Sequence, residues 1–183
     1  PGSVLANQPK DWQLGFQKSA SQGMEDIVWF HDYMLLPVIT AIMVFVLFLI
    51  GYTCIRYRAS RNKEASTTSH NTTIEVLWTL IPCLILIVLA VPSFKVLYSQ
   101  DEIPKADVTI KAVGYQWYWG YEYPDENIIF DSYMIDEKDL KEGQPRLLAV
   151  DNEVYVPVNK VVKVMITAND VLHAWALPSF GVK

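Results

Sequence analysis

The sequence has few of the residues that build disulfide frameworks or metal clusters. It has two cysteines and three histidines in 183 residues. Cys54 and Cys83 both lie within long apolar runs, where a disulfide framework or a conventional zinc site is not expected, so we expect them only to pack. The sequence also lacks a phosphate-binding glycine loop and a basic, aromatic-interleaved strip. It therefore predicts no nucleic-acid partner.

Charge is missing from two long stretches. Residues 33–55 and 76–94 form uncharged runs of 23 and 19 residues. At about 1.5 Å per residue, each is long enough to cross roughly 30 Å of hydrocarbon as a helix. The alternative is a pair of helices buried in a large soluble core, but the rest of the chain is too short to enclose both. The sequence predicts a transmembrane hairpin.

The distribution of basic residues predicts the orientation and the domains. We expect an outer N-terminal segment at 1–32, a hairpin at 33–98 and a separate domain at 99–183. Within the hairpin, the spans cover about 33–55 and 76–94, joined by an inner loop at 56–75. That loop holds most of the nearby positive charge, on Arg56, Arg58, Arg61 and Lys63. It should therefore face the cytoplasm or matrix, with both termini on the other side. The absence of an initiator Met and of a signal-like apolar core indicates a processed product.

The segment after the second span is acidic and has a strand-like pattern. From Lys95 onward it holds nine basic and fourteen acidic residues, a net charge of −5, and an acidic surface of this kind favours a cationic partner. Apolar residues occupy every second position at 108–112 and 162–166, which is typical of half-buried strands. Short strands separated by turn residues predict an all-β sandwich or Greek-key barrel.

Six aromatic residues occur between positions 115 and 123, in the run YQWYWGYEY. One interpretation is an aromatic belt at the membrane interface, where Trp and Tyr rings lie with one edge in water. The other is a rigid aromatic surface that docks a protein and passes electrons. The residues alone leave both interpretations open.

Two single polar residues have similar alternatives. His173 is the one histidine beyond the second span, and it is either a metal ligand or a satisfied core residue. Glu75 lies at the inner mouth of the second span, where a carboxylate either reaches back to the interface or opens a proton path.

Five strings resemble cytochrome c oxidase subunit II, in order along essentially the whole chain. They are IEVLWTLIP at 74–82, GYQWYWGYEY at 114–123, FDSYM at 130–134, RLLAVDN at 146–152 and DVLHAWALPSFGVK at 170–183. The opening string WQLGFQ at 12–17 is similar to bacterial and mitochondrial members.

The resemblance implies a two-helix transmembrane hairpin followed by an all-β, cupredoxin-like Greek-key domain. In that family the outer domain carries a dicopper centre that accepts electrons from cytochrome c. The haems lie in catalytic subunit I, and the whole complex reduces oxygen and pumps protons. The chain would thus be part of an enzyme without being catalytic alone. It would lie in the mitochondrial inner membrane or bacterial plasma membrane, with its β domain on the intermembrane-space or periplasmic side.

The resemblance also assigns roles to individual residues. His173 matches the first copper ligand, Trp117 matches the electron-entry tryptophan, and Glu75 matches a carboxylate at the mouth of a proton channel. Four acidic residues match or lie near the surface that docks cytochrome c: Glu122, Asp125, Asp151 and Asp170.

The family's other copper ligands lie in a Cys-x-Glu-x-Cys-x-x-x-His-x-x-Met string that residues 174–183 do not contain. A dicopper centre needs thiolates and further imidazole. We expect either a fragment or a naturally split subunit, with a β domain incomplete at its C-terminus and a second polypeptide completing the site. The competing functions are a copper-free quinol oxidase subunit II and a non-redox membrane assembly subunit.

Overall fold

The computed structural model describes residues 8–102 and 104–183, which divide into two compact units. The helical unit is Ser19–Asp101, and the β unit is formed by the described residues before and after it. Each unit has its own secondary structure and its own packing, so each is described separately.

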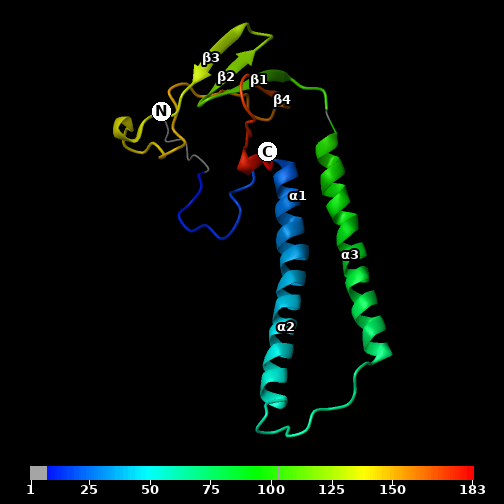
Figure 1. Cartoon of the computed structure of the whole chain (residues 1–183). Coiled ribbons are helices and arrows are strands. Elements are labelled where there is room, and N and C mark those ends of the chain that lie inside the picture. Colours follow the sequence, from blue (N-terminus) through cyan, green and yellow to red (C-terminus); the bar gives the residue numbers. More distant parts are fainter. Residues whose placement is uncertain (1–7, 103) are drawn as a thin grey trace. The chain divides into compact units, whose positions relative to one another are not determined.

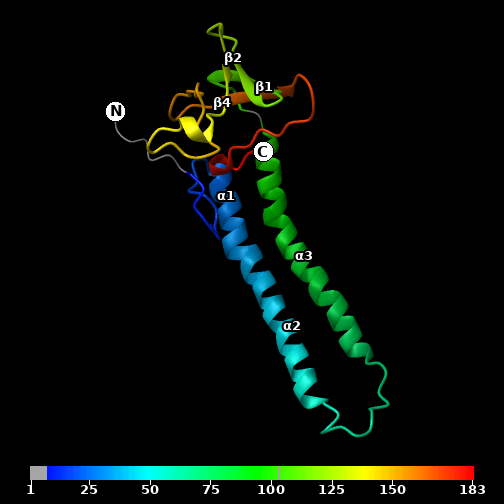
Figure 2. The same ribbon diagram turned by 60° about the vertical axis from the view of Figure 1, so that its left-hand side comes forward.

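Two long helices make up the helical unit. The first is continuous over Gln22–Arg56 and consists of α1 (Gln22–Phe30), a π-helical turn (His31–Leu35) and α2 (Leu36–Arg56). The second is α3 (Thr72–Asp101). Both views show the two helices side by side, joined by a loop at the end where α2 stops (Figures 1 and 2). The helices include the two uncharged runs and continue beyond them.

The apolar side chains of both helices face outward. In the most apolar window of each helix none of the residues is buried, and large side chains such as Phe48 and Leu86 are about two-thirds exposed. Such exposure is costly in water but favourable in hydrocarbon, and both helices are long enough to span it. This part of the chain is a membrane hairpin, as the sequence predicts.

Individual residues account for the N-terminus of α1 and for the irregular turn before α2. The Ser21 hydroxyl accepts a hydrogen bond from the Met24 amide at the start of α1, which satisfies one of the free amides of the first turn. Pro37 lacks the N–H that would bond to the carbonyl one turn earlier, and the wide π-helical turn lies directly before α2. The irregular turn therefore coincides with the position where regular bonding is already interrupted.

Four strands form one sheet in the β unit. They are β1 (Val108–Tyr115), β2 (Tyr118–Tyr123), β3 (Ile128–Ser132) and β4 (Val162–Ala168), in the order β3-β2-β1-β4. The first three pair antiparallel, whereas β4 pairs parallel with β1. This is the spatial order of a Greek key, in which the fourth strand returns beside the first. The parallel direction of β4 was not predicted from the sequence.

The core of the β unit lies on one face of this sheet. Ile110, Ala112 and Tyr121 are buried there, which fits the alternation at 108–112 because side chains two positions apart share a face. The Trp175 indole packs against this cluster and donates a hydrogen bond to the Tyr121 hydroxyl at 3.2 Å. The hydroxyl is thus satisfied inside an apolar cluster, where a missing partner would be costly.

Candidate functional site

The aromatic run folds into the hairpin formed by β1 and β2. Tyr115 pairs with Tyr118, and Gln116 and Trp117 form the two-residue turn between them. Trp117 is 88% exposed. A large aromatic ring at the end of a tight hairpin is held by the strands on both sides while its surface stays accessible.

Three tyrosine rings stack beside this turn. The Tyr118 ring lies 4.7 Å from that of Tyr115 and 4.4 Å from that of Tyr133, both nearly parallel. Loss of hydration raises the pKa of the Tyr118 phenol, with a further contribution from its contact with Tyr133. The stack supports the turn that carries Trp117.

The parallel pairing of β1 and β4 determines which loops meet. Gly114 lies opposite Ala168, so both strands end at the same edge of the sheet. The turn at 116–117 follows β1 there, and the loop that begins at Asn169 follows β4. The Asn169 amide donates to the Gly114 carbonyl at 3.0 Å, which holds the second loop against the end of β1. Residues more than fifty positions apart thus come together.

His173 is the functional candidate that this arrangement positions most tightly. Its ring lies over Gly114, where a Cβ would come within 2.7 Å of the imidazole carbons. The ring of Trp119 meets it edge-on, with centroids 5.8 Å apart. Only 16% of the His173 side chain is exposed. The sequence allows this packing because position 114 has no side chain.

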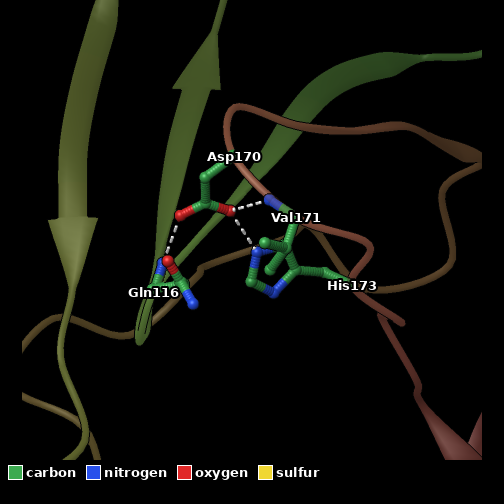
Figure 3. A network of polar contacts seen from close by, with 4 residues as sticks. All are labelled: Gln116, Asp170, Val171 and His173. Carbon is green, nitrogen blue, oxygen red and sulfur yellow. Dashed lines mark hydrogen bonds and ion pairs between the residues drawn. The ribbon is translucent and has the colours of Figure 1, made fainter.

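Asp170 connects the histidine to the hairpin turn (Figure 3). One carboxylate oxygen, Oδ1, accepts hydrogen bonds at 2.6 Å from His173 Nε2 and from the Val171 amide. The other, Oδ2, accepts from the Gln116 amide at 2.7 Å. The bond from His173 is the main cause that lowers the pKa of the Asp170 carboxyl. The carboxylate is therefore ionised at neutral pH and can only accept.

A hollow of about 600 Å³ adjoins these residues. Its lining includes Trp117, Trp119 and His173 together with apolar side chains of the long connection between β3 and β4, among them Met134 and Leu148. The exposed tryptophan and the histidine thus border one concave surface.

The other predicted residues lie apart from this hollow. Glu122 faces Lys111 across the β1–β2 pair, with Lys111 Nζ at 3.0 and 3.1 Å from its two oxygens. Asp125 is exposed in the turn after β2. Because β2 rises about 3.3 Å per residue, both carboxylates lie toward the opposite end of that strand from Trp117.

Asp151 lies nearer to the aromatic stack. Its Oδ1 accepts hydrogen bonds from the Tyr133 amide at 2.7 Å and from the Asn152 amide at 2.8 Å. The four acidic residues therefore differ in surroundings: two carboxylates hold backbone amides, one is paired with lysine and one is exposed in a turn.

Glu75 lies in the first turn of α3, in the helical unit. Its Oε1 accepts a long hydrogen bond, 3.4 Å, from the Asn71 amide, while Asn71 Oδ1 accepts from the amides of Thr73 and Ile74. This is a reciprocal N-terminal cap of the capping-box kind. The carboxylate has a structural use here, and its role in proton uptake stays a prediction.

Matches to known families cover nearly the whole chain. Residues 9–96 match the transmembrane domain of cytochrome c oxidase subunit II, and residues 108–183 match its periplasmic domain. Cytochrome c oxidase subunit 2 of Chondrus crispus is 46% identical over 189 residues, covering all of this chain and 74% of the relative. The chain belongs to the cytochrome c oxidase subunit II family.

Bacterial members of this family are similarly close. A probable cytochrome c oxidase subunit 2 of Rickettsia bellii is 51% identical over 98% of this chain. The chain spans 58 to 66% of the length of the Rickettsia relatives it matches. The crystal structure of the periplasmic domain of subunit II of cytochrome oxidase of Bradyrhizobium japonicum is 58% identical over 44% of this chain, with a TM-score of 0.40. Membership confirms the resemblance and the predicted fold class.

Copper is the metal that membership in the subunit II family implies, and the described residues fit it in part. Within 8–102 and 104–183, no three His, Cys, Asp or Glu side chains gather as a metal-holding group. His173 fits as a single ligand, since one ring nitrogen is already hydrogen-bonded and no described residue hydrogen-bonds the other. Cys54 and Cys83 lie in α2 and α3 with exposed thiols.

Sequence reasoning did not find the contribution of Gly114 and of the Gln116 amide. It placed Asp170 on the docking surface only. The spacing of Asp170 and His173, three residues apart, was a visible signal for their contact, but the link to Gln116 depends on the β1–β4 pairing.

Proposed function

We propose that this chain is the electron-entry subunit of a cytochrome c oxidase. The observation that carries the proposal is the short connection from the exposed Trp117 to His173: the turn that holds Trp117 donates its Gln116 amide to Asp170, and Asp170 accepts from His173. An electron donor can contact the tryptophan from outside, while the histidine is held a few bonds away. In line with the resemblance, we propose cytochrome c as the donor and the haem-containing subunit I as the acceptor.

His173 would hold copper through one imidazole nitrogen. A dicopper centre, when bound, accepts and releases one electron at a time, and it needs thiolate ligands besides imidazole. We propose that the remaining ligands come from outside residues 1–183. Trp119 and the Gly114 backbone keep the imidazole in place and partly shielded from water.

Copper content of the oxidase assembled with this subunit tests the proposal. Elemental analysis and electron paramagnetic resonance should show a mixed-valence copper pair in addition to the copper of the catalytic subunit. His173→Gln should remove the signal of this pair and leave the haem spectrum unchanged. Absence of the pair from the wild-type oxidase would overturn the proposal and favour the copper-free quinol oxidase subunit or the assembly subunit.

We propose two further roles that rest on family membership and charge. The acidic β unit attracts cytochrome c through Glu122, Asp125, Asp151 and Asp170, because complementary charge speeds encounter. Glu75 takes up protons from the inner side, where a carboxylate at the membrane boundary has access to water. Turnover of the variants given in the Discussion tests both roles.

The orientation follows from the basic loop between the helices. We propose that residues 57–71 lie on the inner side and that the β unit lies in the intermembrane space or periplasm. Protease added to the outer side of sealed vesicles should cut the β unit and spare the loop. Cleavage of the loop alone would reverse the assignment.

A further inference from the structure

We propose that the C-terminal end of α2 binds one anionic phospholipid, with an acyl chain along an apolar groove and the headgroup against two arginines. A hollow of about 450 Å³ lies at this end of the helix. Its lining, called the arginine groove below, is formed by Phe48, Gly51, Tyr52, Ile55, Arg56 and Arg61. All of these residues belong to the helical unit. The site is therefore separate from the electron-entry function proposed for the β unit.

The apolar wall of the arginine groove follows from the spacing of residues along α2. Phe48, Tyr52 and Ile55 follow one another at intervals of four and three residues, so their side chains lie on one face of the helix. The rings of Phe48 and Tyr52 stack with their centroids 6.2 Å apart. A Cβ added at Gly51, next to Tyr52, would meet nothing within 4 Å. The missing side chain leaves an open strip along about 10 Å of the helix, at 1.5 Å per residue, which suits part of an acyl chain.

The polar end of the groove comes from the turn that follows α2. The amides of Arg61 and Asn62 donate to the Arg58 carbonyl at 2.9 and 3.1 Å, where the loop leaves the helix (Figure 1). Asn62 fixes this turn, because its Nδ2 donates to the Arg56 carbonyl at 2.7 Å and its Oδ1 accepts from Arg56 Nη1 at 3.3 Å. The turn brings Arg61 back to the groove, although it follows Arg56 by five residues.

The two guanidinium groups lack a neutralising carboxylate. Within the part of the chain that the structure describes, no ion pair includes Arg56 or Arg61. The Arg56 guanidinium carbon instead lies 5.4 Å from the centre of the Tyr57 ring. A guanidinium presents a planar fork of N–H donors that fits two oxygens of a phosphate. The end of the groove is therefore suited to a phosphate group that carries net negative charge.

The apolar wall and the arginines together fit an amphiphile better than a soluble anion. A soluble anion would use the arginines alone and leave the wall uncovered. A phospholipid covers both, because its chain lies in hydrocarbon beside Phe48 and Ile55 while its phosphate lies at the boundary where α2 ends. Basic pockets at such a boundary bind anionic headgroups. In the orientation proposed above, this lipid lies in the inner leaflet.

A photoactivatable phosphatidylglycerol, with a diazirine on its acyl chain, tests the site on the full chain in phosphatidylcholine nanodiscs. Mass spectrometry should place the cross-links mainly on residues 48–55. Unlabelled phosphatidylglycerol should compete, whereas inorganic phosphate should not. Displacement by inorganic phosphate would identify a site for soluble anions and overturn the proposal. Equal labelling by a phosphatidylcholine probe would identify ordinary lipid contact with the helix and would also overturn it.

Three variants distinguish a defined site from general attraction to a basic loop. Arg61→Gln should weaken competition by phosphatidylglycerol by about five-fold, and Gly51→Leu should reduce labelling by filling the open strip without changing the charge. Arg58→Gln is the matched control, because Arg58 lies in the same turn but does not line the groove. Circular dichroism checks that the helices persist. Equal losses in Arg61→Gln and Arg58→Gln, or unchanged labelling in Arg61→Gln, would overturn the proposal.

The assembled oxidase distinguishes a lipid from a neighbouring subunit as the occupant. The same probe should label residues 48–55 in the complete complex, and native mass spectrometry should retain phosphatidylglycerol there, with less retained in Arg61→Gln. Protection of the groove by a helix of another subunit would identify a protein occupant and overturn the proposal. Neither readout uses copper or electron transfer, so the lipid site and the proposed function can fail independently.

Discussion

The helical unit and the β unit satisfy their polar groups over different distances. In the helical unit the carboxylate of Glu75 meets the amide of Asn71, four residues away. In the β unit the carboxylate of Asp170 meets the amide of Gln116, 54 residues away. The hydrogen-bond partner of a polar residue in a helix can therefore be predicted from its neighbours in the sequence. The partner of a polar residue in a loop between strands depends on which strands pair.

The largest difference between the units should be in how much stability a glycine-to-alanine substitution costs. Gly114→Ala forces a methyl group to within 2.7 Å of the His173 ring, and overpacking of this kind costs about 1–3 kcal/mol. We expect a lower unfolding temperature of the β unit and loss of the native His173 NMR signals.

Gly51→Ala is the control for this substitution. Gly51 lies inside α2 with nothing within 4 Å of an added Cβ, and alanine favours a helix over glycine by about 1 kcal/mol. This variant should be neutral or stabilising. Equal losses of stability in the two variants would contradict the packing described for His173.

Trp117 should affect turnover more than binding. Trp117 is 88% exposed and borders the hollow that His173 also lines, so Trp117→Phe keeps an aromatic contact surface while changing the group that passes the electron. We expect a clear fall in electron transfer within the complex, measured by flash photolysis, with little change in the dissociation constant for cytochrome c. A loss confined to affinity would return Trp117 to the role of an interface anchor.

Two substitutions distinguish the capping role of Glu75 from its proposed role in proton uptake. Glu75→Gln keeps an oxygen that can accept from the Asn71 amide but cannot take up a proton, whereas Asn71→Ala removes the cap, at a cost of about 1 kcal/mol. If Glu75 carries protons, the Gln variant should slow turnover in proteoliposomes and the Asn71 variant should not. The reverse pattern would leave the carboxylate only its structural use.

The smallest effects should come from single surface charges. Asp125→Asn removes a carboxylate that is exposed in a turn. Glu122→Gln removes the negative member of the ion pair with Lys111, so that the positive charge of Lys111 is no longer neutralised. Screening over about 8–10 Å limits either effect at ordinary salt. We expect both variants to lower the association rate of cytochrome c and to flatten its salt dependence. Unchanged rates at low salt in both would exclude this end of β2 from the docking surface.

Sequence patterns were sufficient where the information is local. Two uncharged runs predicted the helical hairpin, and the alternation at 108–112 predicted a strand with a buried face. The tyrosine-rich run could be assigned to an aromatic surface, but the turn at 116–117 and its exposed tryptophan needed the strand register. The contact between Asp170 and Gln116 could not be predicted, because the alternation within each strand shows that β1 and β4 are strands but not that they pair with each other in parallel.

The π-helical turn at His31–Leu35 changes how the first long helix must be analysed. A turn of this type holds one residue more than an α-helical turn, and each residue of an α-helix advances about 100° around the axis. A single helical wheel drawn through Gln22–Arg56 would therefore misplace the side chains of α1 relative to those of α2 by about that angle. Deleting one residue from this turn would rotate α1 and carry Met24, which is buried, off its packing face, even though hydropathy and helix length would stay almost the same.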